Sequence, residues 1–127
     1  ISGPAITKIY ELKKNQKISS EDIFKLAENG EDIAIEIIED LINRIAILLS
    51  QLTLTYLPGK GIFLAGSMMR SLIKFIDKNK FKKQFLANIE SPQLEILKAT
   101  QINVVTKENL ALHGCLNYFN SIQKDLN

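Results

Sequence analysis

The sequence is poor in cysteine and histidine: Cys115 and His113 are the single examples among its 127 residues. One cysteine cannot form a disulfide within the chain, and a free thiol fits a reducing compartment such as the cytoplasm. One cysteine and one histidine also cannot supply a zinc site built from Cys and His ligands. We therefore expect a cytoplasmic protein with neither a disulfide framework nor such a zinc site.

Long apolar runs and an excess of one charge are missing as well. The longest stretch without a charged residue, 45–59, contains Ser50, Gln51 and Pro58 and is too short to span a bilayer. Sixteen basic and fourteen acidic side chains leave a formal net charge of +2, which argues against nucleic-acid binding driven by bulk charge. We expect neither a membrane nor a nucleic acid as a partner.

What is present is the composition of one packed domain. Hydrophobic residues make up 46% and charged residues 24%, which indicates a folded core rather than disorder, and the length suits one domain. The chain starts with Ile1 instead of methionine and shows no signal-peptide pattern. We expect it to be a piece of a longer protein.

Helix signals fill the first half of the chain. Pro4 suits a first helical position, and residues 13–17 read as a polar loop. Ser19 is a good N-cap with Asp22 three residues later, and Asn29-Gly30 is a typical helix end.

The longest predicted helix follows Gly30, with about 25 residues and a length of roughly 38 Å. Its apolar residues recur at alternating spacings of four and three, and after Ile45 it becomes apolar nearly all round. We therefore expect its second half to be buried on several sides, as the spine of the domain. The predicted inward positions are Ala34, Ile38, Leu41, Ile45, Leu48 and Leu52, widened by Ile35, Ile42, Leu49 and Tyr56.

The second half alternates strands and helices. Ile62–Ala65 is predicted as a buried strand, Met68–Lys78 as a helix followed by a shorter one, Ile102–Thr106 as a second strand, and Asn109–Lys124 as the last helix. Two strands joined by a crossover should be parallel neighbours. Because two strands alone make a poor sheet, further strands must lie outside this chain or come from a partner, and we expect the isolated chain to self-associate.

The strongest candidate for a binding site is Gly66-Ser67-Met68, between the first strand and its helix. Glycine at the carboxyl end of a parallel strand lets the backbone approach a ligand, and the next helix offers unpaired N–H groups. A plain strand-to-helix turn explains the same pattern, and on pattern alone it is the favoured interpretation. Ser2-Gly3-Pro4 is a second small-residue loop before a helix, for which a structural turn is again favoured.

Other polar groups have ordinary structural explanations. The lysines around Phe81 and Phe85 are typical of a solvated helix face, His113 of a structural position, and the acids near Glu31 of a helix N-terminal turn. The sequence contains no nucleophile–base pair, Walker loop or metal motif. The residues by themselves thus predict a helical α/β lobe with a candidate anion site.

The order of several short segments resembles the C-terminal portion of bacterial glucokinase, the ATP-dependent hexose kinase of the actin-like ATPase superfamily. The resemblance covers nearly all of the chain. The matching segments are Ser2-Gly3-Pro4-Ala5 with Tyr10, Ser50-Gln51-Leu52-Thr53-Leu54, Gly61 to Met68, the spacing of Phe75, Phe81 and Phe85, and Ala111-Leu112-His113-Gly114.

The resemblance implies an α/β fold: an incomplete actin-like ATPase (ribonuclease H-like) lobe, mostly helical, with a short parallel sheet and one long central helix. Residues 1–127 would be the C-terminal part of the large lobe, with the N-terminal domain absent. The phosphate loop, the catalytic base and the sugar-contacting residues would all precede Ile1, so this chain would hold no catalytic residue.

The same resemblance implies ATP and Mg²⁺ as cofactors, bound mainly by residues outside this chain, and glucose and ATP as partners of the full-length protein. The nucleotide-binding residues it implies here are Gly66, Ser67, Met68, Ser2 and Gly3. The family has glycine where this chain has Ser67, and a different loop where it has residues 88–91. These departures keep an alternative open, a non-catalytic sugar-kinase-like regulatory or binding protein.

Overall fold

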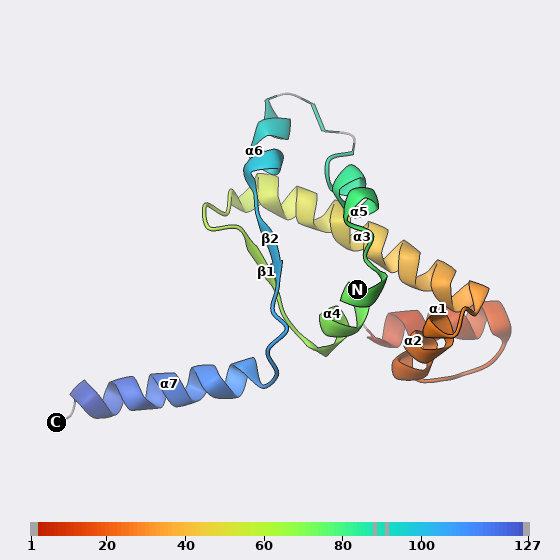
Figure 1. Ribbon diagram of the computed structural model, residues 1–127, viewed down its shortest axis with the longest axis horizontal. Coiled ribbons are helices and arrows are strands. Elements are labelled where there is room, and N and C mark those ends of the chain that lie inside the picture. Colours follow the sequence, from red (N-terminus) through yellow and green to blue (C-terminus); the bar gives the residue numbers. More distant parts are fainter. Residues whose placement is uncertain (1–2, 88, 91, 126–127) are drawn as a thin grey trace.

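The computed structural model of the chain describes residues 3–87, 89–90 and 92–125. Helices dominate it, and two short strands form a parallel sheet (Figure 1). In chain order the elements are α1 (Gly3–Lys14), α2 (Ser20–Glu28), α3 (Asp32–Tyr56), β1 (Ile62–Leu64), α4 (Ser67–Leu72), the 3₁₀ helix η1 (Ile73–Phe75), α5 (Lys78–Phe85), α6 (Gln93–Ala99), β2 (Ile102–Val104) and α7 (Leu110–Asp125).

Helix α3 is the spine of the fold, as its length predicts. The helices α1 and α2 pack near its beginning, α5 near its middle and α6 near its end (Figure 1). One hydrophobic cluster joins these elements, and Ile23, Ile38 and Leu72 are among its fully buried side chains. The single core therefore runs along α3.

The predicted helix ends near α2 and α3 are confirmed. The Ser19 side chain accepts a hydrogen bond from the Asp22 amide at 3.1 Å. Helix α2 ends at Glu28, with Asn29 as its C-cap and Gly30 following at positive φ. The residues 13–17 are only partly a loop, because α1 continues to Lys14.

A carboxylate joins α1 to the beginning of α3. Glu31 is the N-cap of α3, where it accepts the Ala34 amide at 2.6 Å, and it forms an ion pair with Lys14 at 2.9 Å. The hydrogen bond and charge of Lys14, followed by the Ala34 amide, lower the pKa of Glu31 below its usual value. The Lys14–Glu31 ion pair therefore holds the end of α1 against the beginning of α3.

The prediction for the second half of α3 is right in part: Ile45 and Leu49 are buried as predicted, but the expected burial on several sides is wrong. Leu48, Leu52 and Tyr56 are exposed, whereas Ala46 and Thr53 are buried together with Ser50. Each of these buried residues directly follows a residue of the predicted face, namely Ile45, Leu49 and Leu52. One residue corresponds to about 100° of rotation around the helix axis. The face turns because the packing partners change along α3, from α1 and α2 to α5 and α6 (Figure 1).

The two strands are parallel, as predicted, with Ile62 beside Ile102 and Leu64 beside Val104. The prediction of a buried strand is wrong, because Ile62 and Leu64 are only half-buried and Phe63 is 63% exposed. The reason is that helices cover one face of this two-stranded sheet. Because side chains alternate between the two faces along a strand, Ile62 and Leu64 point to the helices and Phe63 points to solvent.

The segment after β1 is broken where one helix is predicted. Helix α4 ends at Leu72, η1 follows, and Ile76 has extended backbone geometry. Asp77 then caps α5 by accepting the amides of Asn79 and Lys80 at 2.9 and 2.8 Å. The capping residue, which the apolar spacing does not reveal, starts a new helix in place of the predicted continuation.

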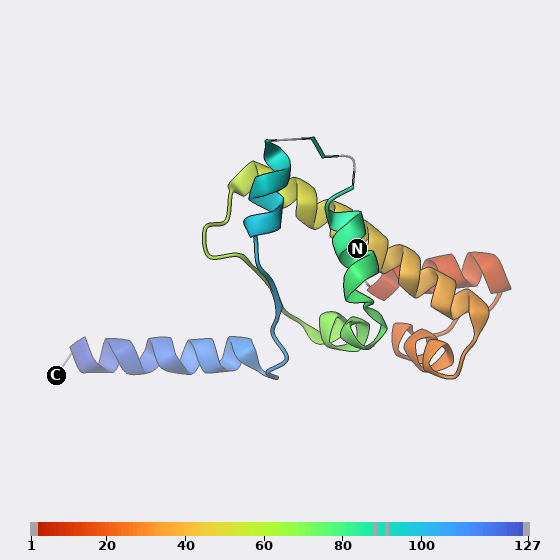
Figure 2. The same cartoon turned by 45° about the horizontal axis from the view of Figure 1, so that its top comes forward.

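Helix α7 projects away from the rest of the chain in both views (Figures 1 and 2). None of its described residues belongs to the hydrophobic core, and Leu112 and Leu116 are 70% and 55% exposed. No helix in the described part of the chain has the length and hydropathy needed to cross a membrane.

Ser50 provides a test of the packing against α3. Its hydroxyl is buried and has no hydrogen-bond partner among the described residues. Ser50→Ala removes this group and improves helix propensity, so we expect the free energy of unfolding to rise by about 1 kcal/mol. Urea denaturation followed by circular dichroism measures the change.

The matched control is Thr53→Val, one turn later on the same buried face. The Thr53 hydroxyl already donates to the Leu49 carbonyl at 2.7 Å, so its removal should bring no comparable gain. A loss of stability in Ser50→Ala would contradict the packing described here.

Candidate functional site

The candidate site is the turn that leaves the carboxyl end of β1. Gly66 is the N-cap of α4, and its carbonyl accepts a hydrogen bond from the Arg70 amide at 3.2 Å. Beside it, the Val105 amide, just after β2, donates to the Leu64 carbonyl at 2.7 Å. The turn therefore lies at the sheet edge where both parallel strands end, the usual place for ligands in α/β proteins.

Gly66 has a backbone conformation that favours glycine strongly. Its φ of 118° and ψ of 163° lie in a region that other residues hardly ever occupy. A Cβ built on Gly66 meets no atom within 4 Å. The glycine is thus required by the turn itself, while the space beside it is open to a molecule approaching the backbone.

The two residues after Gly66 differ in their surroundings. Ser67 is exposed, and its carbonyl accepts a hydrogen bond from the Ser71 hydroxyl at 3.4 Å. Met68 is half-buried and packs against the hydrophobic core. Gly66 and Ser67 therefore present backbone and a hydroxyl to solvent, and Met68 anchors the turn to the core.

In the second predicted loop, Gly3 has a structural role. Ser2 lies outside the described residues. Gly3 begins α1, and a Cβ there would stand 3.2 Å from the Ser20 hydroxyl. The glycine at position 3 thus permits close contact between α1 and α2.

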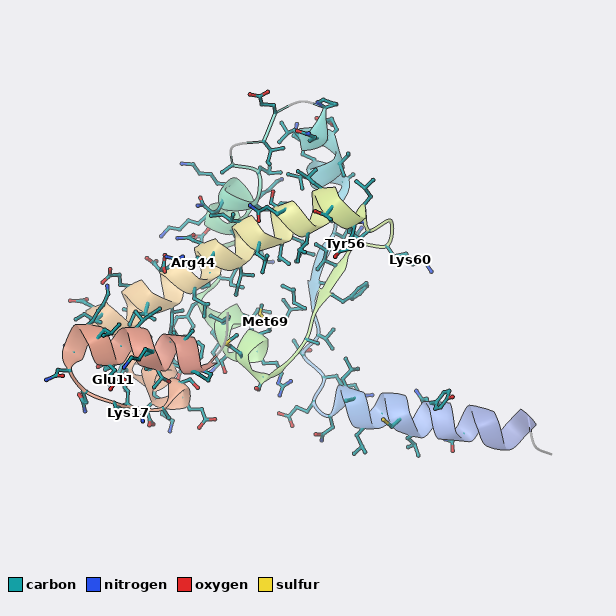
Figure 3. The ribbon with its side chains drawn as sticks, turned by 180° about the vertical axis from the view of Figure 1, so that it is seen from behind. Glu11, Lys17, Arg44, Tyr56, Lys60 and Met69 are labelled. Carbon is teal, nitrogen blue, oxygen red and sulfur yellow. The ribbon has the colours of Figure 1, made fainter. Side chains whose placement is uncertain are left out.

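The beginning of α1 nevertheless lies beside α4 in every view (Figures 1, 2 and 3). Met69 of α4, labelled in Figure 3, is buried in the same cluster as Ile6 of α1. The structure therefore brings Gly3 and the turn at Gly66 to one region of the fold, although they are far apart in the sequence.

The acidic residues at the beginning of α3 have partners within the chain. Glu36 pairs with Lys13 at 2.7 Å, and Asp40 with Arg44 at 2.7 Å. In the described part of the chain, no group of three or more His, Cys, Asp or Glu side chains is arranged to hold a metal ion.

The other candidates from the sequence lie on the helices α5 and α7. His113 and Cys115 are exposed on α7. On α5, Phe85 is buried and Phe81 half-buried, while the neighbouring lysines are exposed, so the predicted solvated face is confirmed.

Sequence reasoning missed a cavity between the sheet and the helices α5 and α6. Its volume is about 600 Å³, and none of the predicted nucleotide-binding residues lines it. The available sequence signal for this cavity was the i, i+4 spacing of Lys78 and Lys82 beside Phe81 and Phe85. That spacing does not reveal that β2 forms the opposite wall of the cavity.

A family model described as Glucokinase matches residues 1–122 of the chain. The matched region contains both strands, the turn at Gly66 and most of α7. No curated protein and no solved structure gives a significant match.

Glycine substitutions test the geometry of the turn. Gly66→Ala forces an unfavourable backbone region, so we expect a loss of about 1–3 kcal/mol in the free energy of unfolding. Gly59→Ala is the matched control, because Gly59 lies outside the left-handed region and a Cβ there meets no atom within 4 Å. We expect it to change stability by less than about 0.5 kcal/mol. Equal unfolding midpoints for the two variants would show that the turn is not strained.

Proposed function

The chain belongs to the glucokinase family, and from this membership we propose that it is part of a kinase that transfers the γ-phosphate of ATP to glucose. In this proposal its own role is to form the nucleotide-side wall of the cleft. The observation that carries the proposal is the family match over residues 1–122 together with the open glycine turn at the carboxyl end of β1.

The turn is suited to adenosine because it offers backbone without side-chain obstruction. Gly66 leaves open space at its Cα, and the exposed Ser67 adds a hydroxyl that can donate to or accept from a ribose oxygen. The half-buried Met68 supplies apolar contact at the edge of the core. Gly66, Ser67 and Met68 would hold the nucleoside, and Gly3 would approach from the beginning of α1. Ser2 belongs to the same proposed set, but it lies outside the described residues.

The proposed place in the whole protein is the C-terminal part of the large lobe of an actin-like ATPase fold. Two features support an arrangement in which other segments complete this unit. The sheet has two strands, and the exposed Phe63 lies on its uncovered face. The described side chains of α7, including Leu112 and Leu116, lie outside the core. The same surfaces support self-association of the isolated chain, which sedimentation at increasing concentration would detect.

Catalysis is proposed to depend on residues outside this chain. Phosphoryl transfer requires a phosphate cradle, a divalent cation and a group that accepts the sugar hydroxyl proton. The acidic side chains at the beginning of α3 pair with lysine and arginine instead. In this proposal Mg²⁺ and the catalytic base are held by residues outside this chain, and the lobe described here contributes nucleotide binding and support for closure of the cleft.

The alternative function is a non-catalytic sugar-kinase-like regulatory or binding protein. Ser67, in place of the family glycine, is the observation that favours it. It adds a side chain where the nucleotide would approach. Sugar binding without phosphorylation by the whole protein would support this alternative over the kinase.

Activity assays test the kinase proposal directly. The 127-residue chain alone should show no glucose-dependent ADP formation in a coupled assay, whereas the longer protein that includes it should phosphorylate glucose. Turnover by the purified short chain that survives repurification would contradict the division of roles. If the longer protein has a normal melting curve but shows no turnover of glucose, the kinase proposal is contradicted.

Ser67 provides the matched test of the nucleotide wall, because its substitution leaves the backbone of Gly66 intact. In the longer protein, Ser67→Trp should raise the KM for ATP at least tenfold by filling the approach to the turn, with the KM for glucose nearly unchanged. Ser67→Gly, which restores the family residue, should leave the KM for ATP equal or lower. An unchanged KM for ATP in a folded Ser67→Trp variant would exclude this turn as the nucleotide site.

A further inference from the structure

The cavity between the sheet and α5 and α6 has an apolar lining. Its volume of about 600 Å³ lies within the range of small-molecule sites. Side chains from both strands form one wall, and those from α5, α6 and η1 the others. The apolar lining residues are Leu64, Ile73, Ile76, Phe81, Phe85, Leu86, Leu97, Ile102 and Val104.

The charged residues of this cavity are all basic. Lys78 and Lys82 lie one turn apart on α5, and Lys98 lies on α6. Lys98 pairs with Glu95 at 2.9 Å, but no carboxylate is among the described residues that line the cavity. The cavity thus combines an apolar interior with positive charge contributed by the two helices.

We propose that this cavity binds a single-chain amphipathic carboxylate, such as a fatty acid of about ten to fourteen carbons. The alkyl chain would lie against the apolar wall formed by Leu64, Ile102 and Val104, and the carboxylate would pair with Lys78 and Lys82. Burial of methylenes supplies the affinity, and the lysines select the sign of the head group.

The polar groups on the wall favour this ligand over a nucleotide or a sugar. The Asn103 side chain lies on the opposite face of the sheet, since Asn103 is the exposed residue between Ile102 and Val104 and pairs with the exposed Phe63. The Thr100 hydroxyl already donates to the Ile96 carbonyl at 2.8 Å. A ligand with many hydroxyl groups would leave them unpaired here, at a cost in affinity. The cavity is also separate from the turn at Gly66, since residues 66–68 do not line it.

A chain-length series tests the proposal on the 127-residue protein. Calorimetric titration with octanoate, decanoate and dodecanoate, each kept monomeric, should show affinity rising several-fold with every two carbons, because each buried methylene contributes up to about fourfold. Dodecylamine should bind at least tenfold more weakly than dodecanoate. Equal affinity for the amine, or no dependence on chain length, would overturn the proposal.

Paired variants test the assigned lysines. The double variant Lys78→Gln/Lys82→Gln should weaken dodecanoate binding at least fivefold and reduce its dependence on salt. Lys60→Gln/Lys107→Gln removes the same charge from residues that do not line the cavity, and its affinity should match the unsubstituted chain. Equal weakening in both doubles, with normal melting curves, would show that only overall charge matters.

Methyl resonances locate the ligand, since α7 offers a competing apolar surface. Dodecanoate should shift the methyl signals of Leu64, Ile102 and Val104 and leave those of Leu112 and Leu116 unchanged. Shifts confined to Leu112 and Leu116 would show that the amphiphile coats α7, and would overturn the cavity assignment. A second copy of the chain is the other possible occupant of the cavity. If the chain dimerises through this cavity and the dimer no longer binds dodecanoate, the cavity is assigned to the second copy and the fatty-acid proposal is overturned.

Discussion

The fold depends on the burial of α3 along a face that changes from one end to the other. Near its beginning the buried face contacts α1 and α2, and further along it contacts α5 and α6. Branched side chains such as Ile38 fill the first interface, and burying one of them stabilises the fold by about 1.5–3 kcal/mol. Small residues such as Ala46 allow close approach in the second. Without this helix the other helices would have no common core.

The position of the candidate site follows from the end of α3. Leu57 ends the helix in a left-handed conformation, and its amide donates to the Thr53 carbonyl at 2.9 Å. Gly61 then lets β1 approach the second strand, because a Cβ there would stand 2.6 Å from the Gln101 carbonyl oxygen. The paired strands in turn place Gly66 at their carboxyl edge. The packing of the helices and the geometry of the turn at Gly66 are therefore parts of one arrangement.

Two surfaces of this chain have opposite characters. The turn at Gly66 is open and built from backbone, which suits a polar ligand that is recognised through hydrogen bonds. The cavity beneath β1 and β2 is apolar with basic residues on α5 and α6. Leu64 lines this cavity and lies two residues before Gly66, so β1 connects the two. Any change in the packing of that strand would reach both.

The sequence by itself determined the elements whose signals are local. Ser19 and Asn29-Gly30 marked helix ends, the apolar spacing predicted the length of α3, and the two short apolar runs predicted a parallel pair. The order of motifs also indicated the family that the family model matches. Tertiary structure alone decided which side of α3 is buried beyond Ile45, because that side is set by which helices pack there. It also decided the exposure of Phe63 and the cavity between sheet and helices, since both depend on surfaces that meet only after the chain has folded.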